Sequence, residues 1–389
     1  MRLAILAIAL FFGLLATPVM AGDAEIAALK AVLAPGPVDV GLFNAAFLKA
    51  VPAAQIEAGV GPLKTLIGPV VSVEPRGGMS YAVETASHEM LADISLDADG
   101  KIGGLLFHTP LDKISGIEDL LKQIGTIAPQ SAYLVLKDGK SVYAGNADTP
   151  LAVGSAFKLG VLKALRDEID AGTRKWPDVV TLEAGDISLP SGTLQTWPVG
   201  SPLTLHTLAA LMISISDNTA ADLLLRIVGR DKVEAALGIA PVLTTRELFT
   251  LKANPALKAK YQAGDLAAKR AVLAEADLLP LPDGAKVGTP HDAAVEYDLS
   301  ASKLCALIEA VGDLDVTQIN PGVASKPDWM TLSFKGGSEI GVLSFVTLAV
   351  RADGARYCVS AIWNGDKAID ESAAATAYAG VLGKLARGG

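Results

Sequence analysis

Ser155-Ala156-Phe157-Lys158 opens a stretch that decides the fold of the second half of this chain. If Ser155 starts a helix here, Lys158 lies one turn on, at i+3, so both side chains project from the same face. Gly172 is a suitable stop for that helix. A lysine amine beside a serine hydroxyl takes its proton when burial and neighbouring positive charge lower the amine pKa. The plainer alternative is a helix-capping serine with a solvated lysine. Apolar residues follow at helical spacing: Phe157, Val161, Leu162, Leu165 and Ile169.

Ser216-Asp217-Asn218 falls in a predicted turn between two helical patterns, Leu205–Ser214 and Thr219–Val228. Short polar side chains are allowed in a turn and are able to point into a cleft. Ser216 is therefore a candidate to relay a proton to a leaving group, and Asn218 a candidate to hold a substrate amide. The alternative for this triplet is a helix cap.

Lys335-Gly336-Gly337 stands at the predicted end of a strand, Met330–Phe334. The two glycines leave the strand edge open to a ligand, and Lys335 is suited to attract its carboxylate. The Ser338 N–H is a candidate oxyanion donor, together with a backbone N–H at the start of the Ser155 helix. A glycine-rich bulge is the alternative.

Each motif alone is weak evidence, and a second Ser-x-x-Lys, at Ser300 and Lys303, is interpreted as a decoy. Together and in this order, the three triplets supply a nucleophile, a proton shuttle and a cationic anchor for acyl transfer without histidine. The histidines are scattered without metal-ligand spacing, and no glycine-rich phosphate loop is present, so no cofactor or metal is predicted. The histidines are His88, His108, His206 and His291.

This ordered set resembles the serine β-lactamase and penicillin-binding-protein superfamily, class A branch, over residues 129–389, and Trp329-Met330 adds to the resemblance. The resemblance implies an α/β fold: an antiparallel sheet with flanking helices plus a helical subdomain. It also implies a small-molecule substrate, which is a β-lactam, an ester or a related amide. The implied roles are Ser155 as acylated nucleophile, Lys158 as base partner, Ser216 as proton shuttle, and Asn218, Lys335, Gly337 and Ser338 as substrate-binding residues.

Two positions depart from the family pattern. Gly336 replaces the usual Thr or Ser, and Ser338 is the candidate to supply the missing hydroxyl. No Glu-x-x-Leu-Asn loop, whose Glu activates the deacylating water, follows Asn218; the nearest Glu is Glu247, interpreted as a surface or salt-bridge residue. Slow β-lactam turnover is therefore expected. A non-hydrolysing acyl- or β-lactam-binding protein, a D-Ala-D-Ala-type peptidase and a pure interaction module remain as alternatives.

Residues 23–112 predict a small α+β domain, followed by a linker over 113–128. Two helical patterns precede four short strands, with Asp99-Gly100 as a hairpin turn between the last two. This pattern resembles the cone-shaped NTF2/steroid-isomerase fold, and the whole layout resembles the clavam-biosynthesis-associated serine hydrolases. The domain is expected to support the hydrolase without catalysis of its own. The predicted strands are Val70–Glu74, Ser80–Thr85, His88–Leu96 and Lys101–Phe107.

Residues 1–21 have the pattern of a signal peptide, with Arg2, an apolar run over Leu3–Leu15, and small residues at Val19-Met20-Ala21. They predict an exported protein, periplasmic or secreted. No later segment is apolar enough to predict a membrane span. The net charge of −9 argues against nucleic-acid and anionic-lipid partners.

The chain has two cysteines, Cys305 in a helical pattern and Cys358 in a strand pattern. An exported protein is able to pair them. Since nothing in the sequence brings the two elements together, two buried free thiols are favoured.

Overall fold

The computed structural model describes residues 22–284, 287 and 295–388. The predicted signal peptide, residues 1–21, lies outside these residues, as does His291. The chain divides into two compact units. The described residues up to Leu120, together with Ser372–Lys384, form the first unit, and Leu121–Glu371 with Leu385–Gly388 form the second.

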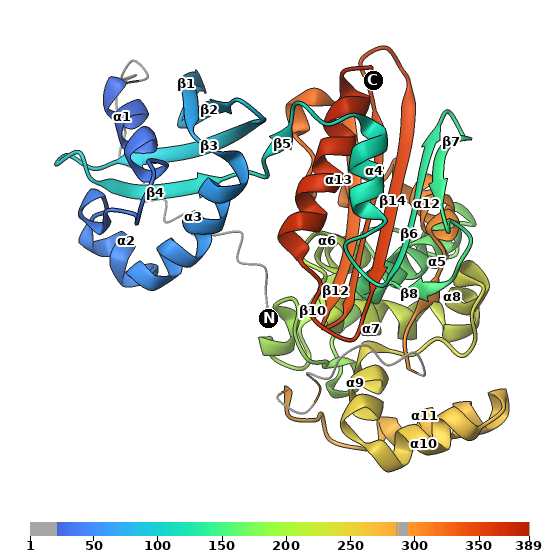
Figure 1. The fold of residues 1–389 in the computed structure, drawn as a ribbon. Helices are drawn as coiled ribbons and strands as arrows, with labels where there is room; N and C mark the ends of the chain where they lie inside the picture. Colours follow the sequence, from blue (N-terminus) through green and yellow to red (C-terminus); the bar gives the residue numbers. More distant parts are fainter. Residues whose placement is uncertain (1–21, 285–286, 288–294, 389) are drawn as a thin grey trace. The chain divides into compact units, whose positions relative to one another are not determined.

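The first unit is an α+β structure in which three helices and one face of an antiparallel sheet enclose a core (Figure 1). Strand β3 alternates, with His88, Met90, Ala92 and Ile94 buried, which is the pattern of a half-buried strand. The sheet order is β1-β2-β3-β4, and β5 pairs with β3. The elements are α1 (Asp23–Val32), α2 (Ala45–Ala50), α3 (Ala53–Ile67), β1 (Val70–Gly77), β2 (Ser80–Thr85), β3 (His88–Leu96), β4 (Ile102–Phe107) and β5 (Leu111–Asp112).

The predicted linker, 113–128, contains a helix, α4 (Ile117–Ile124). The C-terminal helix α13 (Glu371–Ala386) belongs to the first unit for most of its length. Lys384 of α13 donates a hydrogen bond to the Lys113 carbonyl at 3.0 Å. The NTF2-like resemblance of residues 23–112 stays a prediction.

The second unit is built on a five-stranded antiparallel sheet in the order β12-β13-β14-β6-β7, with β12 at one edge. Helix α12 packs on this sheet, and a helical region containing α5 to α11 completes the unit (Figure 1). The predicted fold class, an antiparallel sheet with flanking helices and a helical subdomain, is confirmed. The strands are β6 (Gln130–Lys137), β7 (Lys140–Gly145), β12 (Thr331–Glu339), β13 (Val342–Val350) and β14 (Arg356–Asn364).

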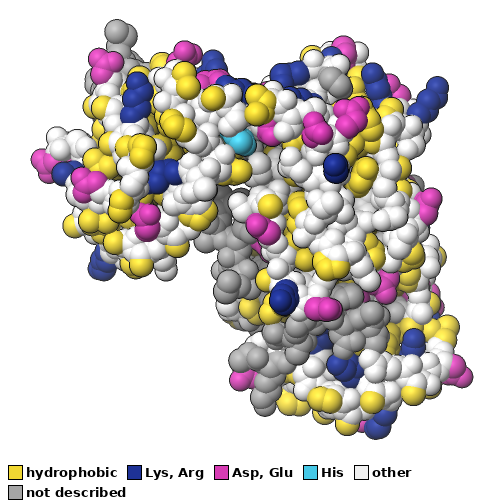
Figure 2. Space-filling view, viewed as in Figure 1, with side chains coloured by type: hydrophobic (Ala, Val, Ile, Leu, Met, Phe, Trp, Pro, Cys, Tyr) yellow, Lys and Arg dark blue, Asp and Glu magenta, His cyan; other side chains and the backbone are white. Residues whose placement is uncertain are grey.

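Two short strand pairs form separate two-stranded sheets in this unit, β8 (Leu151–Ala152) with β11 (Asp298–Leu299) and β9 (Val179–Thr181) with β10 (Pro202–Thr204). The helices are α5 (Lys158–Asp170), α6 (Leu205–Ser214), α7 (Asn218–Val228), α8 (Arg230–Leu237), α9 (Thr245–Ala253), α10 (Pro255–Ala263), α11 (Leu266–Asp277) and α12 (Ala301–Val311). On the face shown in Figure 2, acidic and basic side chains of the described residues are interspersed.

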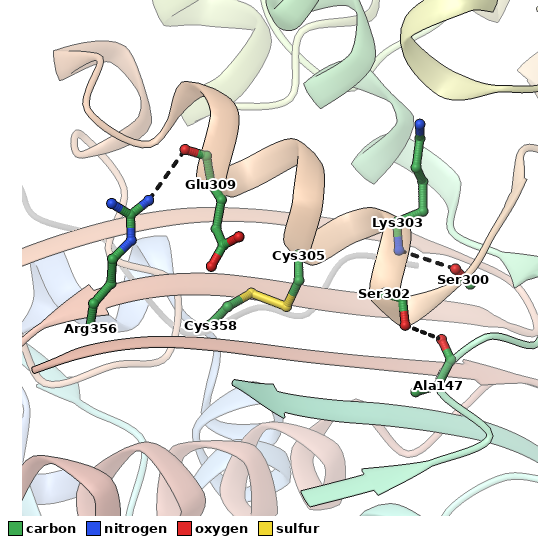
Figure 3. Close-up of a disulfide and its surroundings, with 8 residues drawn as sticks. All are labelled: Ala147, Ser300, Ser302, Lys303, Cys305, Glu309, Arg356 and Cys358. Carbon is green, nitrogen blue, oxygen red and sulfur yellow. Dashed lines mark hydrogen bonds between the residues drawn. A yellow bond between two sulfur atoms is a disulfide. The ribbon is translucent and has the colours of Figure 1, made fainter. Parts of the chain in front are cut away.

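The structure corrects three sequence-based expectations. Cys305 and Cys358 are not free thiols: they form a disulfide that links α12 to β14, with their Cα atoms 5.9 Å apart (Figure 3). Lys335 does not end its strand, because Gly336 to Glu339 continue the pairing with β13. The helix predicted from Ser155 begins instead with a 3₁₀ turn, Gly154–Phe157, and becomes α-helical at Lys158.

Candidate active site

Ser155 lies in the 3₁₀ turn between β8 and α5, where the backbone is fixed on both sides. On one side, the Val153 N–H donates to the Tyr297 carbonyl at 3.0 Å. On the other, the Phe157 ring stacks on the Tyr297 ring, with centroids 3.8 Å apart. Gly154 has φ +49°, a left-handed conformation that favours glycine and lets the chain turn sharply into the helix. Tyr297 therefore fixes the segment that presents the Ser155 hydroxyl.

Lys158 is fully buried, and its amine points to the turn that follows α6. Its Nζ donates to the Ser216 carbonyl at 2.6 Å, to Ser216 Oγ at 3.2 Å and to Asn218 Oδ1 at 2.6 Å. Burial lowers the pKa of Lys158 to about 7, although the carboxylates of Asp222 and Asp217 favour its charged form. An amine with this pKa exists at neutral pH in both protonation states, as a general base requires.

The turn holding Ser216 is held rigidly by its neighbours. Ser216 itself has φ +57°, and Asp217 caps α7 by accepting from the Ala220 N–H at 2.9 Å. The other carboxylate oxygen of Asp217 accepts from the backbone N–H groups of Thr193 and Leu194. Since Asp217 is buried and bonded at both oxygens, it positions Ser216 and Asn218 rather than facing a substrate.

Lys335 lies within β12 and reaches the same serine from that strand. Its Nζ donates to Ser216 Oγ at 3.1 Å and also to the Gly336 carbonyl. Burial, together with the positive charge of Lys158, holds the pKa of Lys335 well below its usual range. The Ser216 hydroxyl therefore lies between two lysine amines.

Gly337 brings β12 against the Ser155 turn. A Cβ at this position would lie 2.1 Å from the Val153 carbonyl oxygen and 2.6 Å from the Ser155 nitrogen. A Cβ on Gly154 would lie 3.4 Å from the Ser338 nitrogen, so the backbone nitrogens of Ser155 and Ser338 lie on adjoining segments. Two neighbouring backbone N–H groups are one requirement of an oxyanion hole. The Ser338 hydroxyl donates to Glu371 at 2.6 Å.

Glu247 has no part in the hydrogen bonds described above for Lys158, Ser216 and Lys335. It is fully buried, it accepts from Arg230 at 2.6 and 3.0 Å, and it closes a capping box with Thr244 at the start of α9. It is a salt-bridge residue, as the sequence suggested, although a buried one. Ser300 caps α12 by accepting from the Lys303 N–H at 3.1 Å, and the Lys303 amine points away from it (Figure 3).

Sequence reasoning missed Asp222, a buried carboxyl group on α7. It accepts from the Thr245 N–H and hydroxyl at 2.7 and 2.9 Å and from the Arg246 N–H at 2.9 Å. Burial raises the pKa of Asp222 to about 7 despite these hydrogen bonds. An acidic residue within the apolar run Ala220–Leu225 was the available signal.

Among the residues that the structure describes, no group of three or more His, Cys, Asp or Glu side chains is placed to hold a metal ion. Within the same residues, no helix is both long enough and apolar enough to cross a membrane.

Known proteins resemble part of this chain. Residues 114–286 match the beta-lactamase enzyme family. Over these residues, which include Ser155, Lys158 and Ser216, the chain is similar to that family. A beta-lactamase from Sphaerobacter thermophilus has the same fold, with 18% sequence identity and a TM-score of 0.50 over 70% of this chain and 96% of that one.

A beta-lactamase from Xanthomonas campestris pv. campestris aligns with 16% identity and a TM-score of 0.49 over 69% of this chain and 97% of that one. PBP-A aligns with 15% identity and a TM-score of 0.47 over 69% of this chain and 96% of that one. No curated protein matches the sequence.

Proposed function

We propose that this β-lactamase-like chain is an exported serine hydrolase that is acylated at Ser155 by a β-lactam, an ester or a related amide. The observation that carries the proposal is the Lys158–Ser216–Lys335 network. It places two buried lysine amines with lowered pKa on a single hydroxyl, beside the turn that presents Ser155.

In the proposed acylation, the neutral Lys158 amine accepts the Ser155 proton as the bond between Ser155 Oγ and the substrate carbonyl carbon forms. The Ser155 and Ser338 N–H groups stabilise the oxyanion. The carbon–nitrogen or carbon–oxygen bond then breaks, and the leaving atom takes a proton from Ser216. Lys158 replaces that proton across the 3.2 Å contact, so the amine is again neutral.

Substrate binding is assigned to Asn218, Lys335 and the edge of β12 at Gly337 and Ser338. Lys335 has Ser216 and a carbonyl as partners, and a substrate carboxylate would stabilise its charged form. Gly337 allows close approach along the strand. The preferred substrate is therefore a small acyl donor that bears a carboxylate.

Slow hydrolysis of the acyl-enzyme is part of the proposal. A deacylating base must hold a water, but both carboxylate oxygens of Glu247 are bonded to Arg230. This observation also favours the second candidate, a non-hydrolysing β-lactam- or acyl-binding protein. A D-Ala-D-Ala-type peptidase is a further alternative, in which a peptide amine leaves and another acceptor completes the transfer.

Export is proposed from two features. Residues 1–21 have the pattern of a signal peptide, and Cys305 and Cys358 form a disulfide, a bond typical of oxidising compartments. The first unit is proposed to support the hydrolase without chemistry of its own. In it, Asp93 accepts from Ser80 and contacts His108 at 2.9 Å, and Asp97 closes the hairpin turn at Lys101.

The test is intact-protein mass spectrometry after exposure to a penicillin, a cephalosporin and an activated ester. One stoichiometric adduct is expected on the wild type and on Ser300→Ala, and none on Ser155→Ala. A stable adduct without turnover would identify the acyl-binding alternative. Labelling that survives Ser155→Ala, or that maps to Ser300, contradicts the proposed nucleophile.

A further inference from the structure

Lys252 forms a buried ion-pair cluster with two carboxyl groups that the reaction above does not use. Lys252 lies on α9 with 4% of its surface exposed. Its Nζ lies 2.7 Å from Glu296 Oε1 and 2.5 Å from Glu339 Oε2. The Glu296 side chain is completely buried, and 22% of the Glu339 side chain is exposed. Such groups are costly to desolvate, so their burial calls for an explanation.

The two carboxyl groups come from two segments that contact the Ser155 turn, the end of β12 and the segment that contains Tyr297. Glu339 ends β12 and directly follows Ser338, whose nitrogen lies beside Gly154. Glu296 directly precedes Tyr297, which accepts from the Val153 N–H and stacks on Phe157. Lys252 therefore links β12, which carries the Ser338 N–H, to Glu296, the residue before Tyr297. Tyr297 in turn fixes the turn that carries the Ser155 N–H.

We propose that Lys252, Glu296 and Glu339 form a positioning cluster that holds the Ser155 and Ser338 N–H groups at the spacing required for acyl transfer. This inference rests on the proposed function. None of the three residues is proposed to touch the substrate, and they act through the backbone of β12 and through Tyr297. Misplacing a reacting group by about 1 Å costs on the order of 100-fold in rate, so a small shift of β12 is sufficient to be measured.

The charge state of the cluster provides a signature that a purely structural contact lacks. Burial and the neighbouring Glu339 carboxylate raise the pKa of Glu296 to about 9, against the opposing effect of Lys252. Below that pH, a protonated Glu296 faces one carboxylate and one ammonium group, and the cluster is neutral. The Tyr297 hydroxyl, whose pKa burial holds well above its usual range, stays uncharged. Above about pH 9, two carboxylates share one ammonium group and repel each other.

The first experiment measures Ser155 acylation by a penicillin in Lys252→Met and in a matched control, Lys260→Met. Lys260 forms an exposed pair with Glu275 on α10 and α11. Lys252→Met is expected to slow the acylation step about 10- to 100-fold with little change in penicillin affinity, because Lys335 is untouched. The control is expected to match the wild type. Equal acylation rates in the two variants would overturn the proposal.

The second experiment uses Glu296→Gln, which keeps a hydrogen-bond donor but cannot ionise. The wild type is expected to lose acylation rate as the pH rises through about 9, and Glu296→Gln to retain it. Parallel alkaline profiles would contradict the role of the cluster. This comparison remains decisive if Lys252→Met does not fold.

A third readout separates this proposal from the proposed function. Hydrogen exchange of the backbone amides in 153–157 and 337–339 is expected to be faster in Lys252→Met than in Lys260→Met. If no acyl donor labels the wild type but this difference is found, the proposed function fails and the positioning cluster stands. If labelling occurs but the exchange is unchanged, the cluster is wrong and the function stands.

Discussion

The amine of Lys158 is held by the carboxamide of Asn218, whose Oδ1 accepts from it at 2.6 Å. The same carboxamide donates through Nδ2 to the Leu189 carbonyl at 2.9 Å, which fixes its orientation. The Ser216 carbonyl and hydroxyl are the other two acceptors around the amine. A protonated lysine has three donors, and all three are used here. Lys158 must therefore lose a proton before its lone pair is available to Ser155.

Acylation is consequently expected to depend on the protonation of Lys158. Burial lowers the pKa of Lys158 to about 7, so the neutral amine predominates above that pH and the charged form below it. The acylation rate constant is expected to rise through about pH 7 and to fall roughly tenfold for each pH unit below it. The measurement is the rate of adduct formation between pH 5 and 8.

Lys158→Arg provides the companion test, because a guanidinium stays protonated in this range. It is expected to lower the acylation rate by about 100-fold or more. Lys303→Arg, in the second Ser-x-x-Lys sequence, is the control and is expected to leave the rate unchanged. A rate that is independent of pH, or an active Lys158→Arg variant, removes Lys158 as the base.

Gly337→Ala is expected to abolish acylation, because its Cβ would lie 2.1 Å from the Val153 carbonyl oxygen. β12 would have to move away from the Ser155 turn, and the two oxyanion donors would separate. A loss of about 100-fold or more is expected, together with a lower melting temperature. Gly185→Ala is the control, since a Cβ there meets no atom within 4 Å. Wild-type acylation in Gly337→Ala would show that the strand and the turn do not meet in this way.

Glu247→Gln is expected to change stability but not deacylation. The substitution leaves Arg230 without its buried carboxylate, at a cost of roughly 1–3 kcal/mol in the free energy of unfolding. Glu275→Gln, in the exposed pair with Lys260, is expected to change stability little. Chemical denaturation gives the stabilities, and decay of the penicillin adduct gives the deacylation rate. Rapid hydrolysis in the wild type that collapses in Glu247→Gln would instead identify Glu247 as the deacylating base.

Local patterns in the sequence predicted those elements whose signal is local. β2 and β3 have the bounds that their alternating residues and flanking turns predicted. The continuation of β12 past Lys335 was missed, because two glycines weaken a strand pattern and the pairing comes from β13. The Ser216 turn was found because its polar triplet interrupts two apolar helices.

The parts of the site that depend on tertiary contacts were not predictable in this way. Lys252, Glu296 and Glu339 are separated by 44 and 43 positions in the sequence, and each alone looks like an ordinary surface charge. Only the packing of α9 against the end of β12 buries them together. Asp222 was overlooked for the same reason, since its donors come from the start of α9.

The Cys305–Cys358 disulfide is the clearest case, because the helix and the strand that it joins carry no signal of their contact. The bond closes a loop with a sequence separation of 53 residues between α12 and β14. A loop of this length constrains the unfolded chain, and about 2–4 kcal/mol of stability is expected from the bond. Replacing both cysteines by serine is therefore expected to lower the free energy of unfolding by that amount.

Denaturant unfolding with and without a reducing agent measures this contribution. The reducing agent is expected to destabilise the wild type and to leave the Cys305→Ser/Cys358→Ser variant unchanged, which controls for its effects elsewhere. Because the disulfide joins α12 to β14 and shares no residue with the Lys158 network, Ser155 acylation of the folded variant is expected to stay close to that of the wild type. Equal stability of the wild type in both conditions would show that the bond does not form in the purified protein, and would also remove one of the two arguments for export.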